Sequence, residues 1–248
     1  MIARYARLSS FHARQLLRVP FFLQQALAAP LAFEVLRTLG LAGAGAAVPG
    51  SLWFLAGTAG MWSTTTLAVG IIGFQRFQGT LEHLAMSTLP PGVVFGSLAS
   101  SAALIGVIGY PLSFVAQLVT GGQPEVAASD IVGAIVATIA CAASASLLAA
   151  LFVLIRAATV FEPLVLTPVW LLTGVAVPLT AFPSWTTSFA TLHPLTSAVQ
   201  VADQRTLGGA AVMVLVSLGV STLWVIIAAV AARAALRRAR VVGSLGLA

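Results

Sequence analysis

Residues 208–232 read GGAAVMVLVSLGVSTLWVIIAAVAA, a run of twenty-five residues without a charged side chain. The hydrocarbon core of a bilayer is about 30 Å thick, and a helix needs about 20 mostly apolar residues to cross it. The run also lacks the alternating segments of about ten residues that are typical of transmembrane β-strands. It therefore predicts a transmembrane helix.

The composition of the whole chain agrees with this reading. Of 248 residues, 59% are hydrophobic and only 7% are charged, and the mean hydropathy is +1.04. A soluble globular domain carries about 25% charged residues, so the balance excludes an ordinary soluble enzyme or a disordered scaffold and indicates a polytopic membrane protein. The chain has no lysine, which excludes a phosphate-binding P-loop. Its single cysteine, Cys141, excludes a disulfide within the chain and a cysteine-based metal site.

The same length criterion predicts six transmembrane helices. They are 21–45, 51–74, 92–119, 130–155, 162–181 and 208–232. With the N-terminus in the cytoplasm, ten of the twelve arginines fall on the cytoplasmic side, as the positive-inside rule requires. We therefore expect a multi-pass protein of the cell (inner, cytoplasmic) membrane with both termini in the cytoplasm.

Residues 1–19 are too basic to be a span. Arg4, Arg7, Arg14 and Arg18 fall within an arc of about 80° when the segment is drawn as a helix. That pattern is typical of an amphipathic helix in the cytoplasmic interface, with its arginines toward anionic headgroups. The alternative is a basic anchor that only fixes the topology.

Two opposite charges lie inside the first predicted span. Glu34 and Arg37 are three residues apart and so share a helix face. A lone charge at the bilayer centre costs about 2.5–3.5 kcal/mol on insertion scales, and a pair can partly neutralise itself. We interpret them as a candidate intramembrane polar pair that lines a substrate path or a subunit interface. The alternative places both residues near the outer headgroups.

Residues 179–205 follow a cluster of prolines, which interrupt helices. Pro178, Pro183, Trp185 and Pro194 mark this segment, whose apolar content argues against a surface loop. Irregular backbone at membrane depth persists only where protein or water satisfies it. We predict short re-entrant helices that dip into the outer leaflet from the extracytoplasmic side, with Trp185 near the interface.

The loop after the second span is the one sizeable polar cytoplasmic segment between spans. Residues 75–90 read QRFQGTLEHLAMSTLP. Thr80 is suited to cap a short helix that carries Leu81 and Leu84 on one face. A short amphipathic helix between two spans is suited to docking on another protein.

This loop resembles the coupling helix of ABC-2-type ABC transporter permeases, which has the form Arg-x-x-Gly-Thr-Leu-Glu-x-Leu followed by Ser or Thr and Pro. The matching residues are Arg76, Gly79, Thr80, Leu81, Glu82, Leu84, Thr88 and Pro90. Gln78 departs from the pattern, because a charged residue is frequent at that position. A second stretch resembles the family's fifth-span exit and re-entrant segment through Gly174, Pro178, Pro183, Trp185, Pro194, Leu195 and Thr196.

The resemblance implies that residues 1–248 form one all-α ABC-2-type transmembrane domain, the permease subunit of an ATP-driven exporter. It implies a hydrophobic or amphiphilic substrate, such as a drug, an antibiotic or a lipid-like molecule. The permease would pair with a second copy or a sister permease and dock ABC ATPase subunits, which would bind ATP and Mg. The implied docking residues are Arg76, Gly79, Thr80, Leu81, Glu82 and His83. No catalytic residue, cofactor site, metal site or nucleic-acid partner is expected on this chain.

Three other functions compete with this one. An ABC-2 exporter of a lipid-linked glycan differs only in substrate. An ion-driven secondary transporter usually carries acids near the midplane, and here Glu34 is the single acid well inside a span. An intramembrane enzyme would have to recruit His193, but no His/Asp/Ser spacing supports a nucleophile with its base.

Overall fold

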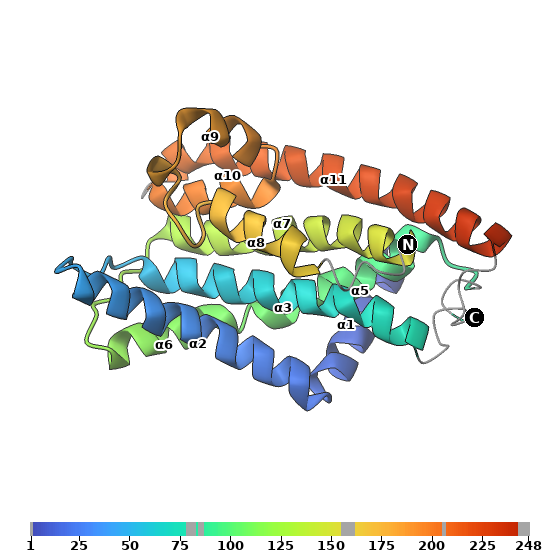
Figure 1. Cartoon of the computed structure of the whole chain (residues 1–248), viewed down its shortest axis with the longest axis horizontal. Helices are drawn as coiled ribbons and strands as arrows, with labels where there is room; N and C mark the ends of the chain where they lie inside the picture. Colours follow the sequence, from blue (N-terminus) through green and yellow to red (C-terminus); the bar gives the residue numbers. More distant parts are fainter. Residues whose placement is uncertain (1, 78–82, 84–86, 155–161, 205–206, 243–248) are drawn as a thin grey trace.

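The computed structural model describes residues 2–77, 83, 87–154, 162–204 and 207–242, and every regular element in this part of the chain is a helix. The long helices run roughly along the long axis of the molecule (Figure 1). They are α2 (Pro20–Gly43), α3 (Leu52–Phe77), α7 (Ala128–Leu154) and α11 (Leu207–Val242). The shorter elements are α1 (Ile2–Leu17), α5 (Pro91–Gly106), α6 (Gly109–Val119), α8 (Glu162–Leu172), η2 (Leu179–Ala181), α9 (Ser184–Ala190) and α10 (Pro194–Asp203). The all-α prediction is confirmed for these residues.

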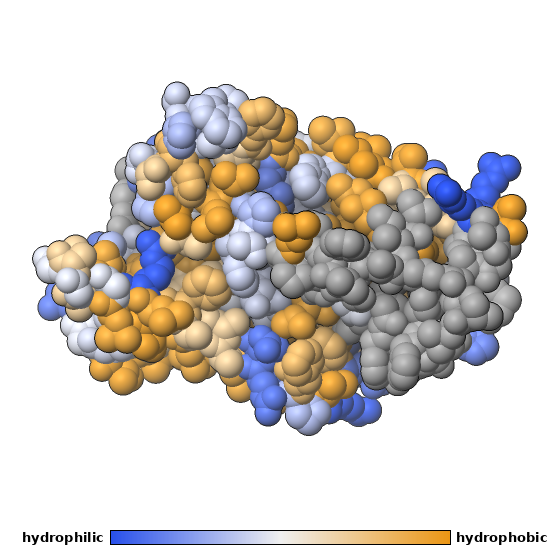
Figure 2. Space-filling view, in the orientation of Figure 1, coloured by the Kyte–Doolittle hydropathy of each residue, from blue (hydrophilic) through white to orange (hydrophobic). Residues whose placement is uncertain are grey.

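Four stretches of the described residues are long and apolar enough to cross a bilayer. They are Pro20–Gly43, Pro91–Val119, Ala128–Val153 and Gly208–Arg238. Large apolar side chains on them are exposed, among them Leu36, Ile135 and Leu215 with exposed fractions of 67%, 59% and 70%. Figure 2 shows such hydrophobic surface over much of the molecule. Exposed apolar surface of this extent indicates contact with lipid or with other protein.

The third predicted span is not one continuous helix. It is divided at Val107 and Ile108 into α5 and α6. Pro111 lies in the first turn of α6 and has no backbone N–H, so the ladder of helical hydrogen bonds cannot run through it. The break allows Gly106 and Gly109 to approach α3 and α2 closely, since a Cβ on Gly106 would lie 2.8 Å from Met61.

The fifth predicted span, 162–181, is wrong in its extent. The helix α8 ends at Leu172, nine residues before the predicted end at 181. Gly174 follows with φ +83°, a conformation that side-chain-bearing residues rarely adopt, and the N–H of Ala176 donates back to the carbonyl of Trp170 at 3.1 Å. This turn ends the helix before Pro178 is reached.

The helix that contains the sixth predicted span, 208–232, extends beyond it. The helix α11 continues to Val242, and its 36 residues measure about 54 Å. That length exceeds a 30 Å hydrocarbon core by about 24 Å. The additional turns carry Arg233, Arg237 and Arg238, which are all exposed.

The core is built from closely approaching helices. Pro30 of α2 packs on Gly60 of α3, where an added Cβ would lie 2.6 Å from the proline ring. Gly57 of α3 packs in the same way on Tyr110 of α6, at 2.5 Å. Without a hydrophobic driving force between helices in lipid, such close approach supplies the dispersion contacts that hold helices together.

Candidate functional site

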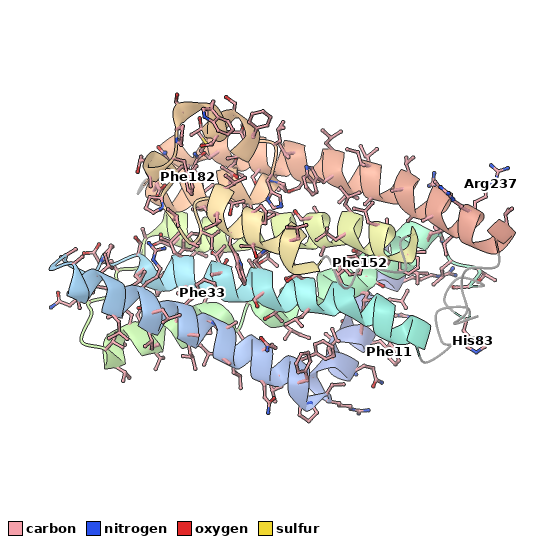
Figure 3. All side chains as sticks on the ribbon, viewed as in Figure 1. Phe11, Phe33, His83, Phe152, Phe182 and Arg237 are labelled. Carbon is pink, nitrogen blue, oxygen red and sulfur yellow. The ribbon has the colours of Figure 1, made fainter. Side chains whose placement is uncertain are left out.

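The described residues that flank the predicted docking segment lie at one end of the helix bundle (Figure 1). The helix α3 ends there at Phe77 and α5 begins there after Pro90. His83 is exposed, and Figure 3 labels it at the same end of the molecule as Arg237 of α11. The side chain of Arg76, in the last turn of α3, lies outside the described part of the chain. Gly79, Thr80, Leu81 and Glu82 also lie outside the described residues.

Exposed arginines gather at this end. Arg233, Arg237 and Arg238 project from the last turns of α11, and Arg4 and Arg7 are exposed on α1. Tyr5 of α1 and Arg233 of α11 line the same cavity, which shows that the two helices lie near each other at this end. The arrangement gives this end of the bundle a positive surface, which favours acidic protein surfaces or anionic headgroups.

Glu34 and Arg37 have separate hydrogen-bond partners. The Nη1 of Arg37 donates to the carbonyl of Val175 at 3.0 Å, which ties α2 to the turn after α8. Glu34 is completely buried, and its Oε1 accepts from the hydroxyl of Thr38 at 3.4 Å. Its Oε2 has no hydrogen-bond partner among the described residues. Both residues lie on α2 and have different hydrogen-bond partners, and their pairing with each other stays a prediction.

The segment between α8 and α11 is helical in short pieces, as the prolines predict. Pro178 precedes η2, Pro183 precedes α9 and Pro194 is the first residue of α10. Trp185 is 65% exposed and packs edge-to-face on Phe189, with ring centroids 6.1 Å apart. The segment contains short helices, and their re-entry into the outer leaflet stays a prediction.

His193 is clamped between two tryptophans. Its ring meets Trp62 of α3 and Trp224 of α11 edge-on, with centroids 5.5 Å and 5.0 Å apart. Its Nδ1 accepts from the N–H of Leu195 at 3.3 Å, and this bond caps α10. The Nε1 of Trp224 donates to the carbonyl of Leu192 at 2.9 Å. His193 therefore fastens the short helices to the long ones, and it has no nucleophile beside it among these contacts.

Gln117 of α6 is a buried polar residue whose role was not predicted from the sequence. Its Oε1 accepts from the backbone N–H of Trp53 at 2.9 Å, and its Nε2 donates to the carbonyl of Pro49 at 2.9 Å. It satisfies a backbone donor in the first turn of α3, which a helix cannot satisfy by itself. The available signal is that Gln117 is the one amide side chain in the third predicted span.

The described residues contain no group of three or more His, Cys, Asp or Glu side chains that could hold a metal ion. Cys141 is buried in α7. The polar side chains of the bundle mostly return to their own helices, as Thr64, Thr65 and Thr66 do by donating to carbonyls of the preceding turn.

Comparison with known proteins places the chain in a family. The sequence model of the ABC-2 type transporter matches residues 4–204, which is most of the chain. No curated protein and no solved structure matches it. The match covers the helices from α1 to α10, including the docking segment and the short helices around His193. Together with the apolar helices, it shows that this membrane-embedded chain belongs to the ABC-2 type transporter family.

Proposed function

We propose that the chain is the permease subunit of an ATP-driven exporter. Two permease chains, identical or sister subunits, would form the pathway for a hydrophobic or amphiphilic substrate. Separate ABC ATPase subunits would bind ATP and Mg and dock on residues 75–90. The family match carries this proposal, because members of the family are the transmembrane components that work with an ABC ATPase.

The proposed topology has six spans in the inner membrane and both termini in the cytoplasm. The helices α3 and α8 would supply the second and fifth crossings, and the short helices from η2 to α10 would lie on the outer side. Three arginines on α11 and two on α1 support placing their end of the bundle in the cytoplasm.

Docking can be tested by co-purification with an ATPase subunit. Replacing Leu81 and Glu82 with alanine should weaken complex formation and ATP turnover, because both residues fall in the docking motif. A matched control replaces Leu192 and Glu125, which are exposed and far from residues 75–90 in the chain. Unchanged assembly in the first double variant would contradict the docking assignment.

Orientation can be tested with single cysteines, because Cys141 is buried and its replacement by alanine gives a cysteine-free background. A cysteine at Gln123 should react with an impermeant maleimide added to intact cells, whereas one at Arg238 should react only after the membrane is opened. Both positions are exposed in the fold. The reverse pattern of labelling would overturn the proposed topology.

One observation favours an ion-driven transporter as a second candidate. Glu34 is a fully buried acid in α2 with one unpartnered oxygen, and intramembrane acids often mark ion or proton pathways. Uptake of substrate into inverted vesicles distinguishes the two functions. ATP should drive it for the exporter, and a proton gradient without ATP should drive it for the alternative.

A further inference from the structure

A cavity of about 550 Å³ lies at the arginine-rich end of the bundle, away from α2 and α8. It is formed where α11 packs along α7 but makes few contacts with α5, and α1 covers the gap. Ile139 of α7 and Val225 of α11 line it and are 42% and 48% exposed, so the cavity opens to the outer surface of the bundle. Its volume falls within the range of about 300–1,000 Å³ that is usual for small-molecule sites.

The walls of the cavity are effectively apolar. Most of the lining residues are apolar, among them Phe95, Ile139, Val225 and several alanines and glycines. The hydroxyls present are already satisfied, since Tyr5 and Ser100 are hydrogen-bonded to each other at 2.6 Å and Ser146 donates to the carbonyl of Ala142 at 2.7 Å. An occupant of the interior therefore gains from burying hydrocarbon and finds no free polar group.

One charge stands at the cavity. Arg233 is the single charged side chain among the described lining residues, and it is exposed. It makes no ion pair or hydrogen bond with another described residue. Pro90, the residue before α5, also lines the cavity. Arg233 therefore lies at the end of the bundle where the predicted docking segment meets α5. A guanidinium next to an apolar cavity complements a molecule with an anionic head and a hydrocarbon tail.

We propose that this cavity binds an anionic phospholipid of the cytoplasmic leaflet, with one acyl chain inside it and the phosphate against Arg233. The lipid joins α1, α5, α7 and α11 as a resident ligand and is not the exported cargo. The leaflet assignment rests on the topology of the proposed function, whereas the binding itself does not.

The test measures lipid binding to the full chain in detergent by native mass spectrometry, with phosphatidylglycerol and phosphatidylcholine as probes. Phosphatidylglycerol should bind about five-fold more tightly, which corresponds to about 1 kcal/mol for one arginine near an anionic headgroup. Arg233→Gln should remove this preference. Arg238→Gln is the matched control, since Arg238 is exposed on the same helix but does not line the cavity, and it should change affinity by less than about two-fold.

A second pair of variants tests the tail. Ala229 is half-buried. It faces α5, since a Cβ added to Gly92 of α5 would lie 3.5 Å from the Cβ of Ala229. Ala229→Leu should fill part of the cavity and weaken both lipids, whereas Ala234→Leu on the exposed face should not. Arg233→Gln changes only an exposed side chain, so it remains informative if Ala229→Leu does not fold.

Three binding results, and one transport result, would overturn the proposal. The binding results are equal affinity for the two lipids in the unaltered chain, retention of the preference in Arg233→Gln, and unchanged binding in a folded Ala229→Leu variant. ATP-dependent movement of labelled phosphatidylglycerol to the outer leaflet that Arg233→Gln abolishes would make the lipid cargo and also overturn it. Cysteine labelling checks the topology separately, so a wrong orientation would be distinguished from absent binding.

Discussion

Replacing Gln117 with leucine should destabilise the end of the bundle where α3 begins by about 1.5–4.5 kcal/mol. The N–H of Trp53 is buried and would lose its acceptor at 2.9 Å, and an unsatisfied buried donor costs about 1–3 kcal/mol. The carbonyl of Pro49 would lose a partly buried bond, which contributes about 0.5–1.5 kcal/mol. Leucine has a similar size and offers neither a donor nor an acceptor, so it isolates the hydrogen bonds from packing.

The assay is thermal unfolding in detergent, followed by intrinsic tryptophan fluorescence. For a chain of this size, 1 kcal/mol corresponds to roughly 2–4 °C in Tm, so the midpoint should fall by about 3–18 °C. Gln123→Leu is the matched control, because it makes the same change of residue type at an exposed position. A midpoint for Gln117→Leu that stays within about 1 °C of the Gln123→Leu midpoint would refute the capping role.

Two further predictions follow from packing and burial. Gly60→Val should lower Tm strongly, because its Cβ would lie 2.6 Å from Pro30, whereas Gly40→Val should have a small effect, since nothing lies within 4 Å of that position; a similar loss in both variants would contradict the close packing of α2 on α3. Burial lowers the pKa of His193, which lies between the spans, to about 3, whereas the unfolded imidazole titrates near 6.5. Only the unfolded chain then takes up the proton, so stability should fall as pH drops below 6.5, by about 2 kcal/mol at pH 5. His193→Gln lacks this loss, and equal pH dependence of the two unfolding midpoints would show that the imidazole is not buried neutral.

The sequence predicted the long helices well where hydropathy alone determines them. The runs of α7 and the apolar part of α11 are nearly free of charge, α2 carries only the two opposite charges of Glu34 and Arg37, and all three helices are long enough to cross a bilayer. The short helices around Pro183 and Pro194 were also predictable, because proline fixes where a helix can start. Both signals are local and survive without knowledge of the tertiary structure.

The ends of α8 and α11 were not predictable in this way. Residues 173–181 are apolar enough to continue a span, but the left-handed backbone of Gly174 ends α8, and hydropathy does not record backbone conformation. In α11, by contrast, the alanines, leucine and arginines after residue 232 have high helix propensity, and the helix continues beyond the apolar run. A hydropathy criterion reports the limits of the apolar segment and not those of the helix.

The candidate site was predictable in kind and less so in detail. The predicted docking motif can be recognised from its residue types alone, but the contacts that it would make depend on a partner chain. Gln117 illustrates the general difficulty, because its two partners are 64 and 68 residues away in the sequence. The cavity beside Arg233 likewise needs four helices to be placed before it exists.

The unbroken length of α11 has a mechanical consequence. In its first half, Ser217 donates to the carbonyl of Pro194 at 2.8 Å, and at its middle the Nε1 of Trp224 donates to the carbonyl of Leu192, while Arg237 lies near its C-terminal end. No proline interrupts the helix between them, and helices without such a break bend only gently. Ser217, Trp224 and Arg237 are therefore held on one stiff helix. A movement of this helix that displaces Arg237 would therefore also displace the short helices that Ser217 and Trp224 hold.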